Sequence, residues 1–140
     1  MSNLSRFIEA QANSYQAAFL EISNGRKKTH WMWYIFPQVK GLGFSHTSRY
    51  YAIEDINEAA EFLKHPVLGD RLINISRELL KLESNNATGI LGSPDDIKLK
   101  SSMTLFSCVP DSDPVFQLVL DKFFGGVRDE NTLKLIENKP

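Results

Sequence analysis

Residues 25–38, GRKKTHWMWYIFPQ, place three cations and a histidine directly before a run of large aromatic side chains. Flat rings with a polar edge, such as Trp31 and Trp33, stack on a purine, a nicotinamide or a sugar face, at about 1–3 kcal/mol per base in nucleic-acid complexes. The same run also fits a buried core helix or a membrane-interface anchor, although it is short for the latter. A pocket wall is therefore one of three alternatives for this segment.

The charged residues before the aromatic run also allow two interpretations. Arg26 has the fork geometry that holds a phosphate, and two lysines follow it. Cations just after a helix also complement the negative end of its dipole while they stay solvated. His30 is a candidate general acid or base, but a lone histidine beside a tryptophan is more often a structural hydrogen-bonding group.

A second polar cluster lies in the segment DDIKLKSSMTLF. Lys98, Ser101 and Ser102 are three and four residues apart, so in a helix they share one face. That face would present one cation and two hydroxyls to an anionic or sugar ligand. The hydroxyls would alternatively bond to the preceding helical turn. A Ser–Lys nucleophile pair is a weaker interpretation, because it needs a base and an oxyanion hole.

Other chemical groups give little support for a metal or a cofactor. His46 and His65 lack metal-ligand spacing with His30 or with Cys108, so we expect no metal site and no cofactor. The adjacent acids at 54–55 and 95–96 each include a residue that a helix N-terminus needs. No phosphate loop, dinucleotide fingerprint or Ser/His/Asp signature is present.

Composition restricts the partners. The 140 residues carry 16 Lys and Arg against 17 Asp and Glu, a net charge of −1, so no global field would attract nucleic acid, and we expect none as a partner. The single Cys108 excludes an internal disulfide and, with no signal-peptide pattern, predicts a cytoplasmic protein. No apolar run approaches the roughly 20 residues of a membrane span. The expected partner is a small molecule; the oligomeric state is not predicted.

Periodicity predicts a mainly α fold in one multihelical domain, residues 1–140, with at most a few short strands. Apolar residues recur at helical steps over 5–24 and 66–82. Cap signals predict helices over 55–64, from 93 and over 113–124, each opened by Asp or Ser, and a last helix from about 129. Gly25 and Gly125 are expected to end helices in the left-handed conformation. The segment MTLFSCV, residues 103–109, is the best strand candidate.

Five stretches together resemble a known family: GRKKTHWMWYIFPQVKGLGFS, YYAI, EAAEFLKHPVLGDRL, GSPDDIKLKSSMTLF and LDKFFGGVRDENTL. They are similar to a mostly bacterial family catalogued as domain of unknown function eighteen-ten, over about Phe7 to Leu135. The resemblance implies a known shape but no established activity.

A more distant resemblance is to the YbiA-like, or NADAR, proteins, which are mainly helical and associated with NAD and ADP-ribose. Some of them are N-glycosidases. Gly69 and Arg71 would match a glycine and an arginine of that group, and Met103 and Phe106 a methionine and a phenylalanine. The glutamate that opens the aromatic helix in that group is absent here, where Thr29, His30 and Trp31 stand. The resemblance thus implies the pocket more than the activity.

Two function hypotheses follow. The first is an enzyme that cleaves an N-glycosidic bond in a nucleotide-like or ADP-ribose-like substrate, with His30 as acid or base and Asp95 or Asp96 supplying the missing carboxylate. The second is a binding module for a nucleotide or sugar phosphate that keeps the pocket without catalysis. Interaction with nucleic acid or protein through the basic residues is a weaker third. The predicted ligand-binding residues are Arg26, Trp31, Trp33, Gln38, Ser45, Arg49, Arg71, Lys98, Ser101 and Ser102.

Overall fold

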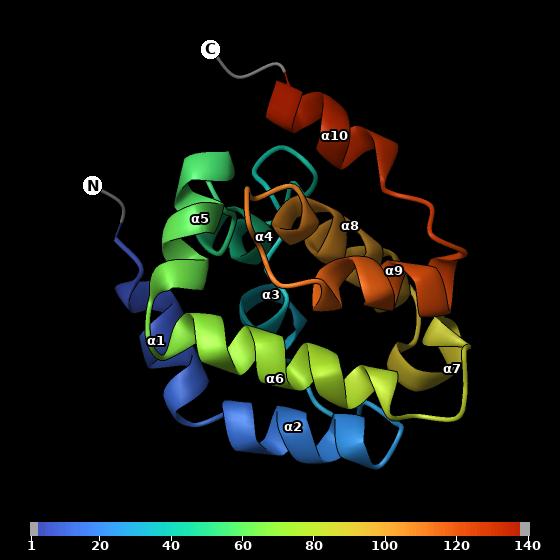
Figure 1. Ribbon diagram of the computed structural model, residues 1–140. Coiled ribbons are helices and arrows are strands. Elements are labelled where there is room, and N and C mark those ends of the chain that lie inside the picture. The colour runs from blue at the N-terminus through green and yellow to red at the C-terminus, as the bar shows by residue number, and fades with distance from the viewer. Residues whose placement is uncertain (1–2, 138–140) are drawn as a thin grey trace.

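Ten helices make up the regular structure of residues 3–137, the part of the chain that the computed structural model describes (Figure 1). In chain order they are α1 (Ser5–Ala12), α2 (Tyr15–Ser23), α3 (Met32–Ile35), α4 (His46–Tyr50), α5 (Ile56–Lys64), α6 (Leu68–Leu80), α7 (Ala87–Leu91), α8 (Asp95–Ser107), α9 (Val115–Phe124) and α10 (Glu130–Glu137). Within this range no strand forms, and the extended chain pairs at one isolated parallel bridge, between Val39 and Ile53. The predicted mainly α class is confirmed; the outermost residues of the predicted 1–140 domain lie outside the described range.

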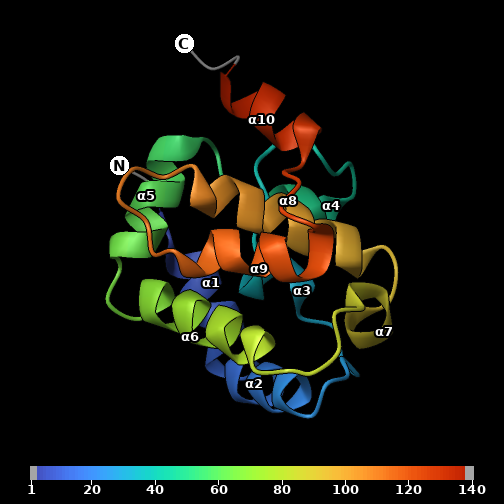
Figure 2. The same cartoon turned by 45° about the vertical axis from the view of Figure 1, so that its right-hand side comes forward.

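The long helices pack in a stack. Helix α2 packs on α6, α6 on α9 and α9 on α8, and Figures 1 and 2 show α6 between α2 and α9. Helix α5 joins α6 to α8, while α7 and α10 pack on α8 from its two sides. Helix α8 is therefore the most enclosed element, and each residue from Ser101 to Phe106 is buried.

Local signals in the sequence define several helix ends correctly. The Asp55 side chain accepts a hydrogen bond from the Glu58 amide, so α5 begins as predicted. Gly25 and Gly125 have φ of 78° and 61°, the left-handed conformation expected after α2 and α9. The Asp129 carboxylate accepts from the Thr132 amide at the start of α10.

The structure differs from what the sequence indicates in three segments. The expected helix over 5–24 is broken at residues 13–14, and α1 buries Phe7 and Gln11 rather than Ile8 and Ala12, with which the apolar pattern of this segment begins. The aromatic run is helical only over Met32–Ile35. The strand candidate MTLFSCV is helical over residues 103–107, the last part of α8, and residues 108–109 follow the helix; a helix that is buried on every side shows no polar face in its sequence.

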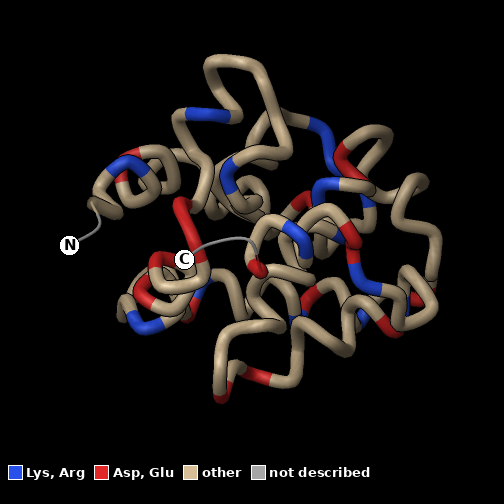
Figure 3. Tube along the Cα trace, turned by 90° about the horizontal axis from the view of Figure 1, so that it is seen from above, with Lys and Arg blue, Asp and Glu red and all other residues tan. Residues whose placement is uncertain are grey.

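Charge and hydropathy add two observations. Lys and Arg are interspersed with Asp and Glu along the trace, as Figure 3 shows. In the described part of the chain, no helix combines the length and the apolar character that crossing a bilayer requires.

At Gly69, helix α6 lies close to the backbone of α5. An alanine Cβ there would lie nearer to the Leu63 carbonyl oxygen than real Cβ atoms approach backbone. We expect Gly69→Ala to lower the free energy of unfolding by roughly 2–4 kcal/mol, measured by urea denaturation, because α5 and α6 must separate. Gly89→Ala is the matched control: its Cβ would meet only the Asn86 side-chain amide, at 3.2 Å, and the change should stay within about 1 kcal/mol. Equal losses in both variants would contradict the explanation.

Candidate functional site

A carboxylate holds the turn that carries the cations. After Gly25 reverses the chain, Glu21 accepts hydrogen bonds from the amides of Lys28 (2.6 Å) and Thr29 (3.0 Å). It also accepts from the Thr29 hydroxyl (2.7 Å) and from Nε1 of Trp31 (2.9 Å). Burial of this carboxyl group opposes ionisation, but the hydrogen bonds from the side chain of Thr29, the two amides and Trp31 outweigh it and lower the pKa of Glu21 from 4.5 to about 2. The turn is therefore positioned by an ionised Glu21.

The two tryptophans have different surroundings. Trp31 is 1% exposed and belongs to the core, where its ring lies 6.2 Å from that of Phe36. Trp33, two residues further along the chain, is only partly buried and lines open cavities. The aromatic run is thus partly core and partly cavity wall, and of this pair only Trp33 lines a cavity that a ligand can enter.

A triad of charges links the run to α8. Asp95 accepts from Lys27 Nζ at 3.0 Å and from Lys98 Nζ at 3.3 Å. The same ammonium groups lie over indole rings: Lys27 is 5.1 Å from the centroid of Trp31, and Lys98 is 4.6 Å from that of Trp33. Two cations share one carboxylate, so the triad carries a net charge of about +1 at neutral pH. An anion next to Lys98 would complete the charge balance.

Lys98 and Trp33 form one side of a cavity of about 340 Å³, which we call the Trp33 cavity. Phe44 and Ile97, 79% and 57% exposed, give it an apolar rim from opposite elements. Its polar lining includes Ser48. Four of the residues predicted as ligand-binding meet here: Trp33, Gln38, Ser45 and Lys98.

The loop over residues 40–52, which includes α4, carries much of this lining. At its base, Ile53 donates its amide proton to the Gln38 carbonyl and Lys40 donates to the Ile53 carbonyl, both at 2.8 Å. The Ser45 side chain caps α4 by accepting from the Ser48 amide at 3.1 Å. Predicted Arg49 lies on α4 and, with Trp33 and Gln38, lines a second and much smaller cavity, about 20 Å³ in volume, that adjoins the first.

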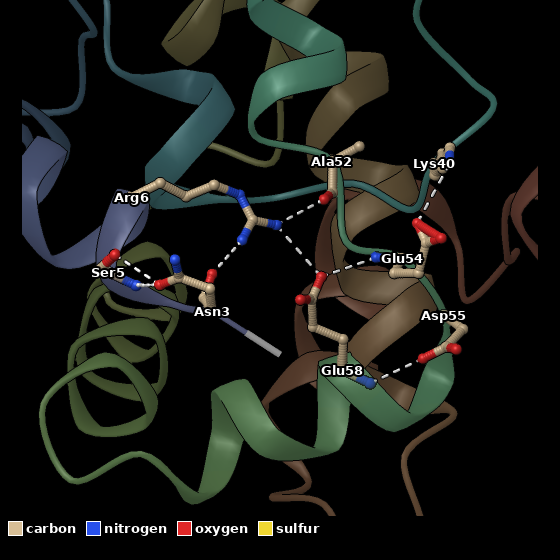
Figure 4. A network of polar contacts seen from close by, with 8 residues as sticks. All are labelled: Asn3, Ser5, Arg6, Lys40, Ala52, Glu54, Asp55 and Glu58. Carbon is tan, nitrogen blue, oxygen red and sulfur yellow. Dashed lines mark hydrogen bonds and ion pairs between the residues drawn. The ribbon is translucent and has the colours of Figure 1, made fainter. Parts of the chain in front are cut away.

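A third and larger cavity, of about 660 Å³, adjoins the small one through Lys40, Arg49 and Ala52. We call it the Arg6–Glu58 cavity. Figure 4 shows its polar network: Arg6 Nη2 donates to the Ala52 carbonyl at 2.8 Å and to Glu58 Oε1 at 3.2 Å. The Glu54 amide donates to the same Glu58 oxygen at 2.8 Å.

Sequence reasoning did not find the Arg6–Glu58 cavity. Glu58 stands three residues after Asp55, the spacing of a capping box, but its carboxylate bonds to the Glu54 amide and to Arg6 instead. The spacing between Asp55 and Glu58 is the one pattern in the sequence that singles out Glu58, and this pattern indicates a structural role at a helix N-terminus. Nothing in the sequence pairs an arginine of the first helix with this glutamate.

The remaining predicted residues lie elsewhere. Arg26 and His30 are exposed, and neither lines the cavities described above. Arg71 lies between α2 and α6, where its guanidinium is 5.1 Å from the Tyr15 ring centroid and Nη1 donates to Gln11. Burial raises the pKa of Tyr15 to about 12, although the Arg71 charge opposes this.

The two serines of α8 are enclosed by the fold. Ser101 donates its hydroxyl to the Ile97 carbonyl at 3.2 Å, and the buried Ser102 Oγ has no partner among the described residues. Lys98 alone of the predicted Lys98–Ser101–Ser102 face lines the Trp33 cavity. The described residues hold no group of three or more His, Cys, Asp or Glu side chains with metal-binding geometry.

Comparisons with known proteins give a family but no activity. A family model described as "Protein of unknown function (DUF1810)" matches residues 1–136. The crystal structure of a conserved hypothetical protein from Mycobacterium tuberculosis, Rv1873, is similar with a TM-score of 0.94 and 40% sequence identity, over 97% of each chain. No curated protein matches. These matches leave the chemistry to be inferred from the cavities.

The Glu21 turn generates a pH-dependent prediction. The pKa of Glu21 in the folded protein lies below its ordinary 4.5, so the ionised carboxylate contributes stability above about pH 4.5, and this is lost as the pH falls through about 2. We expect Glu21→Gln to lower the free energy of unfolding by roughly 1–2 kcal/mol at pH 7, since solvent screens a partly exposed carboxylate.

Urea unfolding at a series of pH values measures this difference between the wild type and Glu21→Gln. The difference in the free energy of unfolding between the two proteins should decrease below pH 4.5 and nearly vanish near pH 2. Glu83→Gln, at an exposed position after α6, is the matched control and should show little deficit at any pH. A Glu21→Gln deficit that stays constant with pH would assign the effect to packing instead of charge.

Proposed function

The chain belongs to the DUF1810 family of proteins of unknown function, and we propose that it binds a small anionic ligand with a flat ring, of the nucleotide class, in the Trp33 cavity. The observation that carries the proposal is the contact of Lys98 Nζ with the Trp33 ring, 4.6 Å from its centroid, at the wall of an open cavity. A cation that lies over an aromatic ring at the wall of a cavity matches a ligand that joins a flat ring to an anion.

The shape and polarity of the cavity support this ligand class. Its volume of about 340 Å³ falls within the roughly 300–1,000 Å³ of small-molecule sites. Trp33, Phe44 and Ile97 offer apolar surface for a ring, and Gln38 offers an amide that both donates and accepts hydrogen bonds. The net positive charge of the Lys27–Asp95–Lys98 triad favours an anion there.

Binding is better supported than cleavage. The residues that line the Trp33 cavity include no carboxylate, and Asp95, the acid nearest to Lys98, is engaged by two lysines. Asp96 likewise accepts a hydrogen bond from the Thr88 hydroxyl. Stabilisation of an oxocarbenium-like transition state requires such a group beside the reacting carbon.

N-glycosidase activity is a second candidate, favoured by the carboxylates of the adjoining Arg6–Glu58 cavity. In this reaction water provides the oxygen that bonds to the anomeric carbon, the carbon–nitrogen bond breaks, and a proton passes to the departing base. Release of free base from NAD, ADP-ribose or ribosylated nucleosides tests it. Turnover that survives His30→Ala would remove the role predicted for that histidine.

Lys98 provides the first test of binding. We expect AMP to bind the wild type and to stabilise it by about 2.7 kcal/mol at 100 times its dissociation constant. Lys98→Gln should weaken AMP binding by about tenfold or more in calorimetric titration, because the cation paired with the phosphate is lost. Lys100→Gln, two residues along the same helix but outside the cavity lining, is the matched control and should bind normally. Equal effects of both changes, or no AMP binding, would contradict the proposal.

Trp33 provides an independent optical test. AMP should change the tryptophan fluorescence of the wild type, because a stacked base alters the environment of the partly exposed Trp33 ring. Trp33→Phe should abolish that change while the buried Trp31 continues to emit. A ligand-induced change that persists in Trp33→Phe would place the ligand elsewhere.

A further inference from the structure

We propose that the Arg6–Glu58 cavity is a second subsite, which takes a hydroxyl-bearing sugar joined through phosphate to the ring bound in the Trp33 cavity. Glu58 is the residue that recognises its hydroxyl groups. The inference rests on the proposed function and extends it: the ligand class becomes a nucleoside diphosphate carrying a sugar. Three features of the cavity lead to it, namely the state of Glu58, the character of the wall and the shared residues.

Glu58 is a buried carboxylate with one oxygen in use. Its side chain is 8% exposed, and Oε1 accepts from Arg6 Nη2 and from the Glu54 amide. Figure 4 shows both bonds on this oxygen, while Oε2 makes no hydrogen bond within the described residues. A carboxylate oxygen can accept about two hydrogen bonds, so Oε2, which is not among the buried atoms without a partner, can accept from a ligand in place of solvent. Since Glu58 lines the cavity, a ligand hydroxyl is a natural donor to Oε2.

Arg6 fixes this carboxylate without competing for Oε2. Its guanidinium lies over the Phe7 ring, 4.4 Å from the centroid, and donates to the carbonyls of Asn3 and Ala52 as well as to Glu58 Oε1. These contacts tie α1 to the loop before α5. The Arg6–Glu58 pair is thus a structural connection whose unused oxygen faces an open volume, and the two roles can be tested separately.

The rest of the wall suits a sugar. Tyr50 is 51% exposed and offers a ring face, and the exposed Asn57 side chain, one residue before Glu58, offers both a donor and an acceptor. A ring face, an amide and a carboxylate are the groups that bind hydroxyl-bearing rings. The volume of about 660 Å³ also exceeds what a single phosphate would fill.

The residues shared between the cavities place the phosphates. Arg49 lines both the Arg6–Glu58 cavity and the small cavity that leads to Trp33, and Lys40 does the same. Lys40 pairs with Glu54 at 3.4 Å, but both side chains are more than half exposed, so the pair is weak and an anion can replace it. The small cavity, of about 20 Å³, has room for about one water molecule, so a diphosphate would lie outside it, against the exposed side chains of Lys40 and Arg49 and between a base on Trp33 and a sugar on Glu58.

The test compares ligands that differ only in the terminal sugar: ADP-ribose against ADP, and UDP-glucose against UDP, by calorimetric titration. In the wild type at least one sugar-bearing ligand should bind about tenfold or more tightly than its parent. Glu58→Gln keeps an oxygen for Arg6 and the Glu54 amide but turns the free acceptor into a donor. It should remove the preference and leave ADP and UDP affinity unchanged, with Glu83→Gln as the matched control.

Each outcome decides between the two proposals. A wild type that binds ADP and ADP-ribose equally, and UDP and UDP-glucose equally, overturns the sugar subsite and leaves nucleotide binding standing. A Glu58→Gln variant that weakens both members of a pair equally assigns Glu58 a structural role and also overturns the subsite. Failure of all four ligands to bind overturns the proposed function itself. If Glu58→Gln does not fold, Asn57→Ala and Tyr50→Ala change only exposed side chains of the same wall, and each must reduce the sugar preference.

Discussion

Enclosure of helix α8 is the constraint on which the rest of the structure depends. Helices α5, α7, α9 and α10 all pack against it, so its buried polar side chains depend on partners inside the fold, and among the described residues Ser102 Oγ is the one that lacks a partner. Ser101 bonds to the Ile97 carbonyl, and Thr104 donates to the Lys100 carbonyl while it accepts from the Asp129 amide. The core helix therefore also anchors the entry into α10. At its N-terminal turn α8 leaves the core, and there it presents Lys98 to the Trp33 cavity.

Carboxylates that accept several hydrogen bonds or ion pairs position the segments around the cavities. Glu21 holds the turn before the aromatic run, Asp95 joins that run to α8, and Glu58 joins α1 to the chain before α5. Each accepts from at least one donor outside its own helix, so each joins two segments of the chain. Asp95 pairs with Lys27 and Lys98, and Glu58 pairs with Arg6. The net charge of the whole chain is −1, although the charge beside Lys98 is locally positive.

The predictable parts of this fold are those set by local chemistry. Cap residues such as Asp55 and Gly125 act on adjacent backbone groups, so their effect can be predicted from a few letters of sequence. The break after α1 could not be predicted in this way. Gln11 is buried and its side chain donates to the Tyr34 carbonyl, a tertiary contact that a pattern of apolar residues does not indicate. The strand candidate at 103–109 is helical over 103–107 for a related reason, since residues 101–106 of α8 are all buried and so show no polar face in the sequence. At the site, Trp33 and Lys98 were predicted by residue type, whereas the pairing of Arg6 with Glu58 spans 52 positions and depends on tertiary packing.

The parallel bridge between Val39 and Ile53 has a consequence for how this protein can vary. The two hydrogen bonds at the base of loop 40–52 join main-chain groups alone, with the amides of Lys40 and Ile53 as donors. No side chain takes part, so substitution within the loop leaves its attachment intact, and proline at either donor position is the replacement that would remove a bond. Side chains of the loop that contact a ligand can therefore differ between relatives, while the two main-chain hydrogen bonds at the base of the loop are kept.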